Sequence, residues 1–412
     1  MSLFAEHEFE NYVEPKPKED IKPSQDDLEH GAKLYIDYFS DVENIEKHSK
    51  KVKLKRMGMR KNELGNAIQD ESLTYQGDFF DDYNIHPKDM VFDISCIHDV
   101  TENKENDKRS FKYHVEDFNR GLDIVSSHTN KDSVPGKTLK WIVEEKTTGK
   151  IVGFIRFASP LMNSKPRNLR LGKSPEMVSF NKHAIMGFVI VPVQPFGYNY
   201  AGGKLLTLLC CSHYAREFLN KKYEGCNICS FETTSLYGSA KAQSQYDGMK
   251  PFIKYYGLTE SKMPPFLPDE TFNYYYNNIF LEGFEKDPVD KKSSNRLLKR
   301  NNYVISYIKK NLEDEKLKNE FISSINKAIS MTQKKRFYIS DYGFENSREV
   351  ILGEQTELIP SKQNYHKFEL DYMIDWWKNK ATNRYEKLKK EGRLRHELEL
   401  WNSDEINFDI IR

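Results

Sequence analysis

The chain has 412 residues, of which 38% are hydrophobic and 30% are charged, so it has enough apolar material for two or three folded domains. Its formal net charge of +1 excludes attraction to a polyanion through gross charge, so any nucleic-acid surface must come from local clustering among its 63 Lys and Arg residues. Five cysteines, no apolar run of about 18 residues and no signal-peptide pattern at the N-terminus favour a cytoplasmic protein with free thiols and no membrane span.

The N-terminal part of the chain is polar, and apolar residues at regular spacing begin only near residue 28. Residues 1–30 contain the stretch Pro15-Lys16-Pro17-Lys18 and few apolar residues, which is typical of a flexible arm. Apolar residues at helical spacing predict a helix over residues 28–42, and we expect the folded domain to begin near residue 31. Residues 47–61 are dense in Lys and Arg, which indicates either a solvated surface or a segment that contacts phosphate.

The next part of the chain has the pattern of a sheet. Strands are predicted at residues 91–97, 139–145, 151–157 and 184–193. The second and third are joined by a short turn that contains Gly149, which is typical of a β-hairpin. A helix is predicted at residues 114–128, and a basic loop at residues 163–173.

Helices dominate the predictions for the second half of the chain. The clearest, over residues 203–223, has an apolar stripe at helical spacing. A short strand at residues 226–233 and a helix at residues 244–256 complete a domain that we expect to end at residue 262. Residues 263–412 are predicted to be a mainly helical region, with long helices at residues 295–330 and 366–401 and strand-like residues at 336–343.

A glycine-rich turn follows the apolar strand at residues 184–193 and opens directly into the long helix. The first turn of a helix has backbone N–H groups without helical partners and the positive end of the helix dipole, and glycines let a backbone approach an anion closely. The sequence therefore predicts a pyrophosphate site. Its residues are Val191, Val193, Gln194, Gly197, Asn199, Gly202, Gly203 and Lys204.

Two alternatives to this interpretation are a P-loop and a purely structural turn. A P-loop needs Gly-x4-Gly-Lys-Ser/Thr, but Gly197 to Lys204 has one residue too many and Leu205 stands where a metal-binding hydroxyl is required. A glycine-rich turn that only joins a strand to a helix stays open as the second alternative.

The turn resembles the coenzyme A loop of the GNAT acyltransferases, which has the form Gln/Arg-x-x-Gly-x-Gly/Ala. The matching segment is Gln194-Pro195-Phe196-Gly197-Tyr198-Asn199, in which Asn199 replaces the small last residue. The order of elements over residues 90–262 is also similar to that family. The resemblance implies an α+β fold, a GNAT-like mixed sheet flanked by helices, and coenzyme A or an acyl-coenzyme A as the cofactor.

Three further segments are similar to a group of phage and anti-phage-defence proteins that includes the Druantia defence component. They are residues 157–160, 195–204 and 232–238. The Mom DNA-adenine modification protein of phages shares a GNAT-like fold with a different cofactor, so it is a guide to the fold alone.

Several side chains after the predicted strands are candidates for the chemistry of acyl transfer. That reaction needs a base for the amine, an acid for the leaving group and backbone N–H groups for the acyl carbonyl. We expect Glu232 to be the base, with Asp247 as a weaker alternative, and Tyr237 and Tyr246 to be acids. A salt-bridged Glu232 and tyrosines that serve in packing are the structural alternatives. The candidates for substrate binding are Arg156, Ser159, Thr233 and Ser235.

The cysteines suggest a metal site as a rival hypothesis. Its ligands would come from Cys210, Cys211, His213, Cys226 and Cys229. A Cys-x2-Cys pair needs a turn, whereas Cys226 and Cys229 lie at a predicted strand, and adjacent cysteines on a helix point in different directions. We therefore expect buried free thiols and no metal.

Basic and aromatic residues recur together in the C-terminal region and form a candidate nucleic-acid surface. They are Arg296, Lys299, Arg300, Lys334, Lys335, Arg336, Lys387, Lys389, Lys390, Arg393 and Arg395, with Tyr303, Phe337, Trp376, Trp377 and Tyr385. Such interleaving suits single-stranded nucleic acid, and it also suits an amphipathic helical bundle with aromatic core residues.

The sequence thus favours a transferase that moves an acyl or related small group to an amine, with a nucleobase in a phage context as one acceptor. The alternative is a non-catalytic nucleic-acid-binding or virus-associated protein that keeps the same fold. The oligomeric state is left open.

Overall fold

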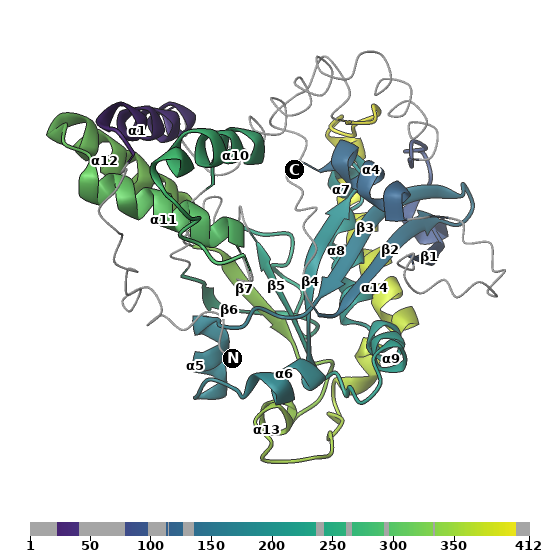
Figure 1. Ribbon diagram of the computed structural model, residues 1–412. Helices are drawn as coiled ribbons and strands as arrows, with labels where there is room; N and C mark the ends of the chain where they lie inside the picture. The colour runs from purple at the N-terminus through teal and green to yellow at the C-terminus, as the bar shows by residue number, and fades with distance from the viewer. Residues whose placement is uncertain are drawn as a thin grey trace, which may run out of the picture. The chain divides into compact units, whose positions relative to one another are not determined.

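The structure is a computed structural model that describes residues 23–40, 79–97, 113, 115–126, 136–235, 243–260, 266–291, 296–332 and 334–400. The chain forms two compact units (Figure 1). The helical unit takes residues 1–48 and 260–334, and the sheet unit takes residues 49–259 and 335–412. The predicted boundary near residue 262 lies close to residue 260, where the chain passes from the sheet unit to the helical unit. However, the structure returns residues 335–412 to the sheet unit and groups the first helix with the helical unit.

The sheet unit contains a seven-stranded mixed sheet in the order β1-β2-β3-β4-β5-β7-β6 (Figure 1). Its strands are β1 Phe92–Ile97, β2 Thr138–Glu145, β3 Lys150–Ala158, β4 Ala184–Pro192, β5 Ser230–Ser235, β6 Lys254–Leu258 and β7 Arg336–Ser340. All neighbours are antiparallel except β4 and β5, which are parallel. The α+β class and the predicted β2–β3 hairpin are confirmed. The hairpin turn ends at Gly149, whose φ of 68° is in the left-handed region that glycine tolerates.

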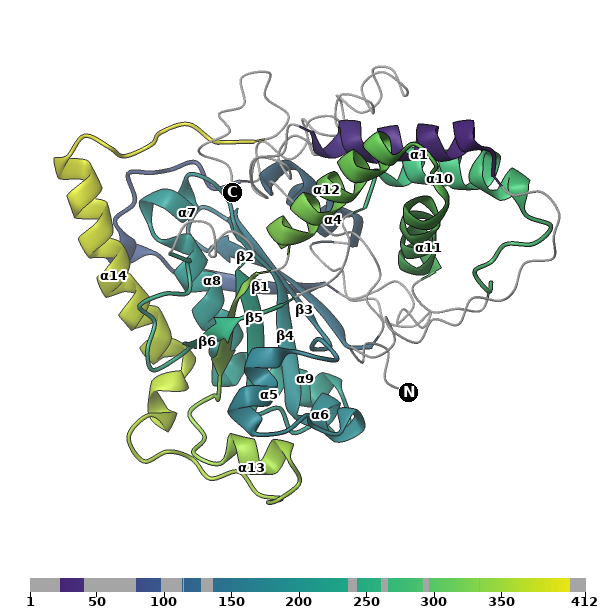
Figure 2. The same cartoon turned by 90° about the vertical axis from the view of Figure 1, so that its left-hand side faces the viewer.

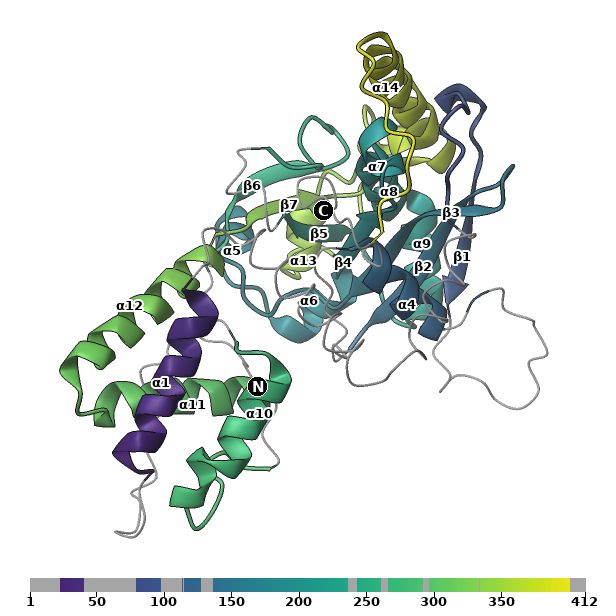
Figure 3. The ribbon, with the colours of Figure 1, turned by 90° about the horizontal axis from the view of Figure 1, so that it is seen from above.

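Helices cover both faces of this sheet (Figure 3). They are η2 Pro87–Asp89, α4 Val115–Val125, α5 Lys165–Leu171, α6 Met177–His183, α7 Phe196–Asn199, α8 Gly202–Cys211, α9 His213–Lys222, α13 Ser347–Ile351, η5 Tyr365–Phe368 and α14 Leu370–Lys390. Helix α8 packs on β3 and β4, and α14 packs along α7 and α8 (Figure 2). Helix α4 covers the other face, where Phe118 contacts Phe154 in a separate apolar cluster. Strand β4 therefore leads into α7 and α8, and α14, from the C-terminal part of the chain, packs against both of these helices.

The parallel pair opens before its two strands end. Strands β4 and β5 pair from Ala184 to Gly187 only, opposite Ser230 to Thr233. At that point the register between β3 and β4 shifts, because Arg156 pairs with Val189 while Phe157 pairs with Gly187, which leaves Phe188 as a bulge. Beyond the bulge β4 continues beside β3 but no longer beside β5. We call this divergence the β4–β5 opening.

Several predicted elements are wrong in type or extent. The helix predicted over residues 244–256 is a series of turns followed by β6, since Gly248 and Gly257 have φ values of 72° and 128° that a helix cannot contain. The long helix predicted over residues 203–223 is broken at Ser212, whose hydroxyl caps α9 by accepting the Ala215 N–H.

Two further boundaries differ from the predictions. The basic loop predicted at residues 163–173 contains α5, and the strand predicted from residue 226 begins at Ser230. The predicted helix at residues 114–128 is confirmed as α4.

The helical unit contains α1 Gln25–Phe39, α10 Asp269–Asn278, η4 Phe280–Gly283, α11 Arg296–Asn311 and α12 Glu315–Thr332. Its core is an apolar cluster of its own, and the buried hydroxyl of Tyr35 donates to Asn301 at 2.7 Å. Ser24 caps α1, so residues 25–30 are helical rather than part of an arm. Residues 1–22 of the predicted arm and the basic segment at residues 47–61 lie outside the described residues. No helix in the described part of the chain is long and apolar enough to span a membrane.

Candidate functional site

The glycine-rich turn is a tight connection between β4 and α8. It contains the short helix α7, and Ala201 then takes a left-handed conformation with φ of 54° before α8 begins. No side chain caps the start of α8. The sequence-predicted residues from Gln194 to Lys204 therefore lie in the turn that leads into α8, as the strand–turn–helix pattern indicated.

The first turn of α8 is covered by the protein's own side chains. A Cβ on Gly202 would lie 2.5 Å from the ring of Phe196, and a Cβ on Gly203 would lie 2.0 Å from the Oε1 atom of Gln245. The Nε2 atom of Gln245 also donates to the carbonyl of Ile190 on β4, at 3.3 Å. Because Gly202 and Gly203 have no side chains, the ring of Phe196 and the carboxamide of Gln245 can pack directly against them. These two groups fill the space that a pyrophosphate would need.

The other residues of the turn hold the turn itself together. Gln194 accepts the Tyr198 N–H through its side-chain carbonyl at 3.0 Å, and a Cβ on Gly197 would lie 2.6 Å from the Gln194 amide nitrogen. Asn199 is fully buried and makes two hydrogen bonds to the backbone of Arg395, at 2.8 and 3.1 Å. That pairing accounts for an amide side chain at position 199. Val191 and Val193 pack in the apolar cluster beneath α4.

Lys204 closes the opposite side of the turn. Its ammonium group donates to the backbone carbonyls of Gln245, at 3.0 Å, and Asp247. Burial lowers the pKa of Lys204, and the nearby positive charges of Lys380 and Arg384 lower it further, while Asp247 acts in the opposite direction. Lys204 therefore binds the residue 245–247 turn rather than projecting into open solvent.

A polar cluster surrounds Asp247 on the same side of the sheet. The hydroxyl of Tyr338 donates to Asp247 at 2.8 Å, and Arg336 forms an ion pair with it at 3.1 Å. Burial would raise the pKa of Asp247, but hydrogen bonds from the Ser244 N–H and the Tyr338 hydroxyl outweigh it, so its pKa is lowered. Asp247, 31% exposed, is thus a carboxylate that orients Tyr338.

Tyr246 lies beside this cluster and faces the β4–β5 opening. Its ring packs against Tyr338 with centroids 5.1 Å apart, and its hydroxyl lies within hydrogen-bonding reach of Thr233 and Gln245. Burial raises the pKa of Tyr246 to about 12, so the phenol keeps its proton at neutral pH. Thr233 in turn donates to the carbonyl of Gly187, the last paired residue of β4, at 2.9 Å.

Glu232 is separated from these groups. Adjacent side chains of a strand point to opposite faces, so Glu232 points away from Thr233 and its neighbours. There it forms an ion pair with Arg167 at 3.1 Å, and each side chain is only 1% exposed. Burial raises the pKa of Glu232, and Arg167 acts in the opposite direction. The structure therefore does not bring Glu232 and Tyr246 together, and it gives Glu232 the salt-bridged role that was the structural alternative.

The remaining substrate-binding candidates are dispersed. Arg156 lies on β3 with its guanidinium 5.2 Å from the ring of Phe188, at the bulge. Ser159 accepts the Lys137 N–H at 2.9 Å, where β3 ends beside the start of β2, while Ser235 pairs with Arg336 in the β5–β7 ladder. Tyr237 lies outside the described residues.

Comparison with known proteins gives no family assignment. The chain matches no protein-family model, no curated protein and no solved structure.

The cysteines do not form a cluster with other ligands. All five have free thiols, and the described residues contain no group of three or more His, Cys, Asp or Glu side chains that could hold a metal ion. His213 instead stacks on Tyr365, with ring centroids 4.1 Å apart, and its Nε2 atom bonds to the Tyr365 carbonyl. Burial raises the pKa of Cys210, Cys211 and Cys229.

The basic and aromatic residues of the C-terminal region are split between the two units. In the helical unit, Arg296 and Arg300 both bind Asp287. In the sheet unit, the rings of Phe337, Trp377 and Tyr385 are buried, and those of Trp377 and Tyr385 belong to the main core. Because they are buried, these three rings are not available to stack on a base.

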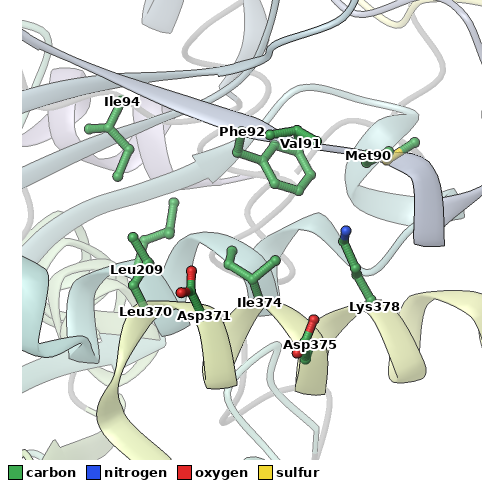
Figure 4. A pocket seen from close by; sticks show the side chains of 10 residues that line it. All are labelled: Met90, Val91, Phe92, Ile94, Leu209, Leu370, Asp371, Ile374, Asp375 and Lys378. Atoms are coloured by element: carbon green, nitrogen blue, oxygen red, sulfur yellow. The ribbon is translucent and has the colours of Figure 1, made fainter.

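A separate cavity of about 390 Å³ lies between β1 and α14 (Figure 4). Its walls are mainly apolar, with Phe92 and Ile374 facing each other, and Asp371, Asp375 and Lys378 stand along the α14 side. None of the sequence-predicted site residues lines it.

Sequence reasoning missed Gln245, Arg336 and Tyr338 as parts of the site. The strand-like pattern at residues 336–343 was visible, and alternation along it puts Arg336 and Tyr338 on one face. Nothing in the local sequence indicates that this strand pairs with β5, which lies about a hundred residues earlier.

Proposed function

We propose that the sheet unit is a GNAT-like transferase that moves an acyl or related small group to an amine, with its reacting groups at the β4–β5 opening. The proposal is supported by the single parallel strand pair, by the bulge at Phe188 where that pair ends, and by the helix that opens after β4. Diverging strands of this kind leave backbone N–H and C=O groups available to a ligand instead of a neighbouring strand.

The observation that carries the proposal is the position of the Gln245 side chain. Its carboxamide bonds to the Ile190 carbonyl in the opening and lies against Gly203 at the start of α8. An amide group thus already occupies the place between strand and helix where a ligand with amide groups would make the same contacts. We infer that the residue 245–247 turn is a plug that a donor molecule must displace.

The side chains around the opening suit proton donation and positioning. Tyr246 keeps its proton at neutral pH and points to the opening beside Thr233, so it is the best placed acid for a leaving group. Asp247 and Arg336 fix Tyr338 next to it. We assign Glu232 the task of holding Arg167 rather than that of the base, because its ion pair is closed to both substrate and water.

Coenzyme A does not fit the glycine turn in this conformation. Gln245 and Phe196 fill the space that its pyrophosphate would need, so no step of the reaction is derived through it. Removing the plug gives a direct test of whether the turn can accept such a donor.

The test compares wild-type protein with the Gln245→Ala variant in thermal unfolding with and without acetyl-coenzyme A. A ligand at 100 times its Kd stabilises a protein by about 2.7 kcal/mol. We expect the variant to gain more from acetyl-coenzyme A than the wild type, because the carboxamide no longer covers Gly203. If no acyl-coenzyme A stabilises either protein, coenzyme A is not the donor.

The acceptor is tested by mass analysis of nucleosides from cells that express the protein. A modified base that disappears with Tyr246→Phe would support transfer to a nucleobase, and Tyr255→Phe is a matched control on the exposed side of β6. Unmodified nucleosides together with no response to any acyl-coenzyme A would exclude the transferase.

A non-catalytic protein that keeps this fold is the second candidate. It is favoured by the same plug, since a permanently filled turn has no donor site, and by the closed ion pair of Glu232. The two candidates differ in the thermal unfolding of the Gln245→Ala variant. Only a transferase is expected to be stabilised by acetyl-coenzyme A when the plug is removed.

A further inference from the structure

The cavity between β1 and α14 is a second candidate site, apart from the groups of the proposed transfer reaction. We call it the β1–α14 cavity. Its volume of about 390 Å³ lies within the range of about 300–1,000 Å³ that is typical of small-molecule sites. Among the residues that line it, none belongs to the β4–β5 opening or to the glycine turn. Its size suits a small molecule, and its lining indicates which chemistry that molecule has.

Most of the wall of the cavity is apolar. Phe92 and Ile94 line it from alternate positions of β1, and alternate side chains of a strand share one face. Leu209 contributes from α8, and Leu370 and Ile374 contribute from α14. All of these except Leu209 are only partly buried, although they pack against the main core. A ligand with an apolar body would therefore remove apolar surface from water, which favours binding.

Three charged side chains of α14 lie beside the apolar wall. Asp371 and Lys378 extend from α14 toward β1 on either side of Ile374 (Figure 4). Asp375 lies one helical turn after Asp371. Within the described part of the chain, none of these three charged side chains makes a hydrogen bond or an ion pair. The lining thus holds two carboxylates and one ammonium group without partners, which leaves one negative charge unbalanced.

The position of that unbalanced charge follows from the spacing along the helix. At a rise of about 1.5 Å per residue, Lys378 lies about 4.5 Å along the axis from Asp375 and about 10.5 Å from Asp371. Residues three apart are neighbours on a helix surface, so the ammonium group offsets the charge of Asp375 first. Asp371, at the other end of the apolar wall, is therefore the group that attracts a cation.

We propose that the β1–α14 cavity binds a small molecule with an apolar body and a protonated amine. The apolar body lies between Phe92 and Ile374, and the ammonium group donates to the Asp371 carboxylate. Such a ligand supplies the partner that the described part of the chain does not give to Asp371. The proposal goes beyond the transferase and does not depend on it, because the two sites share no residue.

The test titrates the full-length protein with three naphthalene probes and follows the fluorescence of the probe. At neutral pH, 1-naphthylmethylamine is a cation, 1-naphthylmethanol is neutral and 1-naphthylacetate is an anion. The three probes share one apolar body, so the differences among their Kd values report the charge that the site prefers.

We expect the wild type to bind the amine at least about tenfold more tightly than the alcohol, because hydrogen bonds between charged groups are the stronger ones. Asp371→Asn/Asp375→Asn should remove this preference and leave binding of the alcohol unchanged. Lys378→Met should tighten binding of the amine, because it removes the positive charge of the lining. Ile374→Trp should weaken binding of all three probes, because the larger side chain fills the cavity.

The matched control is Asp26→Asn/Asp37→Asn on α1. Both side chains are exposed, and Asp26 lies in the first turn of its helix, as Asp371 does. The control therefore makes the same chemical change away from the cavity, and it should leave every Kd as in the wild type. Circular dichroism and melting curves establish which variants are folded. If Ile374→Trp does not fold, Asp371→Asn/Asp375→Asn still decides, because both of its changed side chains are exposed.

Four outcomes would overturn the proposal. Tighter binding of the acetate than of the amine would show an anion site at Lys378. Equal binding of the three probes would show an apolar cavity without charge selection. A preference for the amine that survives Asp371→Asn/Asp375→Asn would place the probe elsewhere. Failure of every probe to bind up to its solubility limit would show that the cavity holds no ligand of this class. None of these outcomes bears on the transferase, whose test is the response of Gln245→Ala to acetyl-coenzyme A.

Discussion

Two carboxylates of the sheet unit, Glu232 and Asp247, have the same chemistry and opposite surroundings. Glu232 is enclosed with Arg167, and each side chain is 1% exposed. Asp247 is 31% exposed and shares Arg336, Tyr338 and the Ser244 N–H. A ligand cannot reach the buried ion pair of Glu232 and Arg167. In contrast, the partly exposed Asp247 and Arg336 could each form a hydrogen bond to a ligand in place of their present partner. The comparison therefore teaches that burial, and not residue type, separates a closed ion pair from a carboxylate that a ligand can reach.

The largest effect is expected from breaking the buried pair. Arg167→Leu would leave the Glu232 carboxylate without its cation in the interior, and loss of one partner of a buried pair costs about 3–5 kcal/mol of folding free energy. Urea unfolding followed by circular dichroism measures it. The double variant Arg167→Leu/Glu232→Leu should recover part of the loss, because no charge is then buried alone, while the carbonyls of Leu161 and Met162 still lack the hydrogen bonds that Arg167 donates. A loss below about 1 kcal/mol in the single variant would mean that water reaches Glu232.

A smaller effect is expected at the exposed cluster. Asp247→Asn keeps the shape of the side chain and removes the charge that faces Arg336, and partly exposed ion pairs contribute about 1 kcal/mol or less. The same urea experiment measures the change. Tyr338→Phe is the matched variant, since it removes only the hydroxyl that Asp247 accepts. If Asp247→Asn lowered the free energy of unfolding as much as Arg167→Leu does, Asp247 would be a structural residue on which folding depends, like Glu232.

The smallest effect is the pH dependence that Asp247 gives to stability. Its pKa is lowered in the folded protein, so its contribution is present above the ordinary value of 3.8 and is lost as the pH falls through the folded pKa. We expect the stability difference between wild type and Asp247→Asn to shrink between about pH 4 and the acid limit of the folded state. Melting temperatures at stepped pH values measure this difference. A constant difference across that range would show that the charge of Asp247 does not contribute.

Local patterns in the sequence predicted a large part of the fold correctly. The apolar stripe that begins at Gly203, the hairpin turn at Gly149 and the buried strand from Ala184 are all confirmed, because each depends on residues that are close in the chain. The break at Ser212 was missed because the apolar spacing continues through it, and only the hydroxyl cap on Ala215 ends one helix and begins the next.

The candidate site could be predicted only in part. The strand–turn–helix geometry placed Gly202, Gly203 and Lys204 correctly at the start of α8. The plug could not be foreseen, since Gln245 reaches Ile190 and Gly203 from a segment that the sequence predicted, wrongly, to be a helix. Pairings between distant parts of a chain depend on tertiary packing, which local propensity does not encode.

The place of β7 has a consequence for how the protein is made. This strand lies between β5 and β6, yet residues 259–335 separate it from β6 along the chain. At about 5–20 residues per second, a ribosome needs several seconds to synthesise that stretch. During this interval β5 and β6 expose backbone edges that only Arg336–Ser340 can join. We expect a nascent chain that stops before residue 336 to depend on chaperones, whereas the complete chain closes its own sheet.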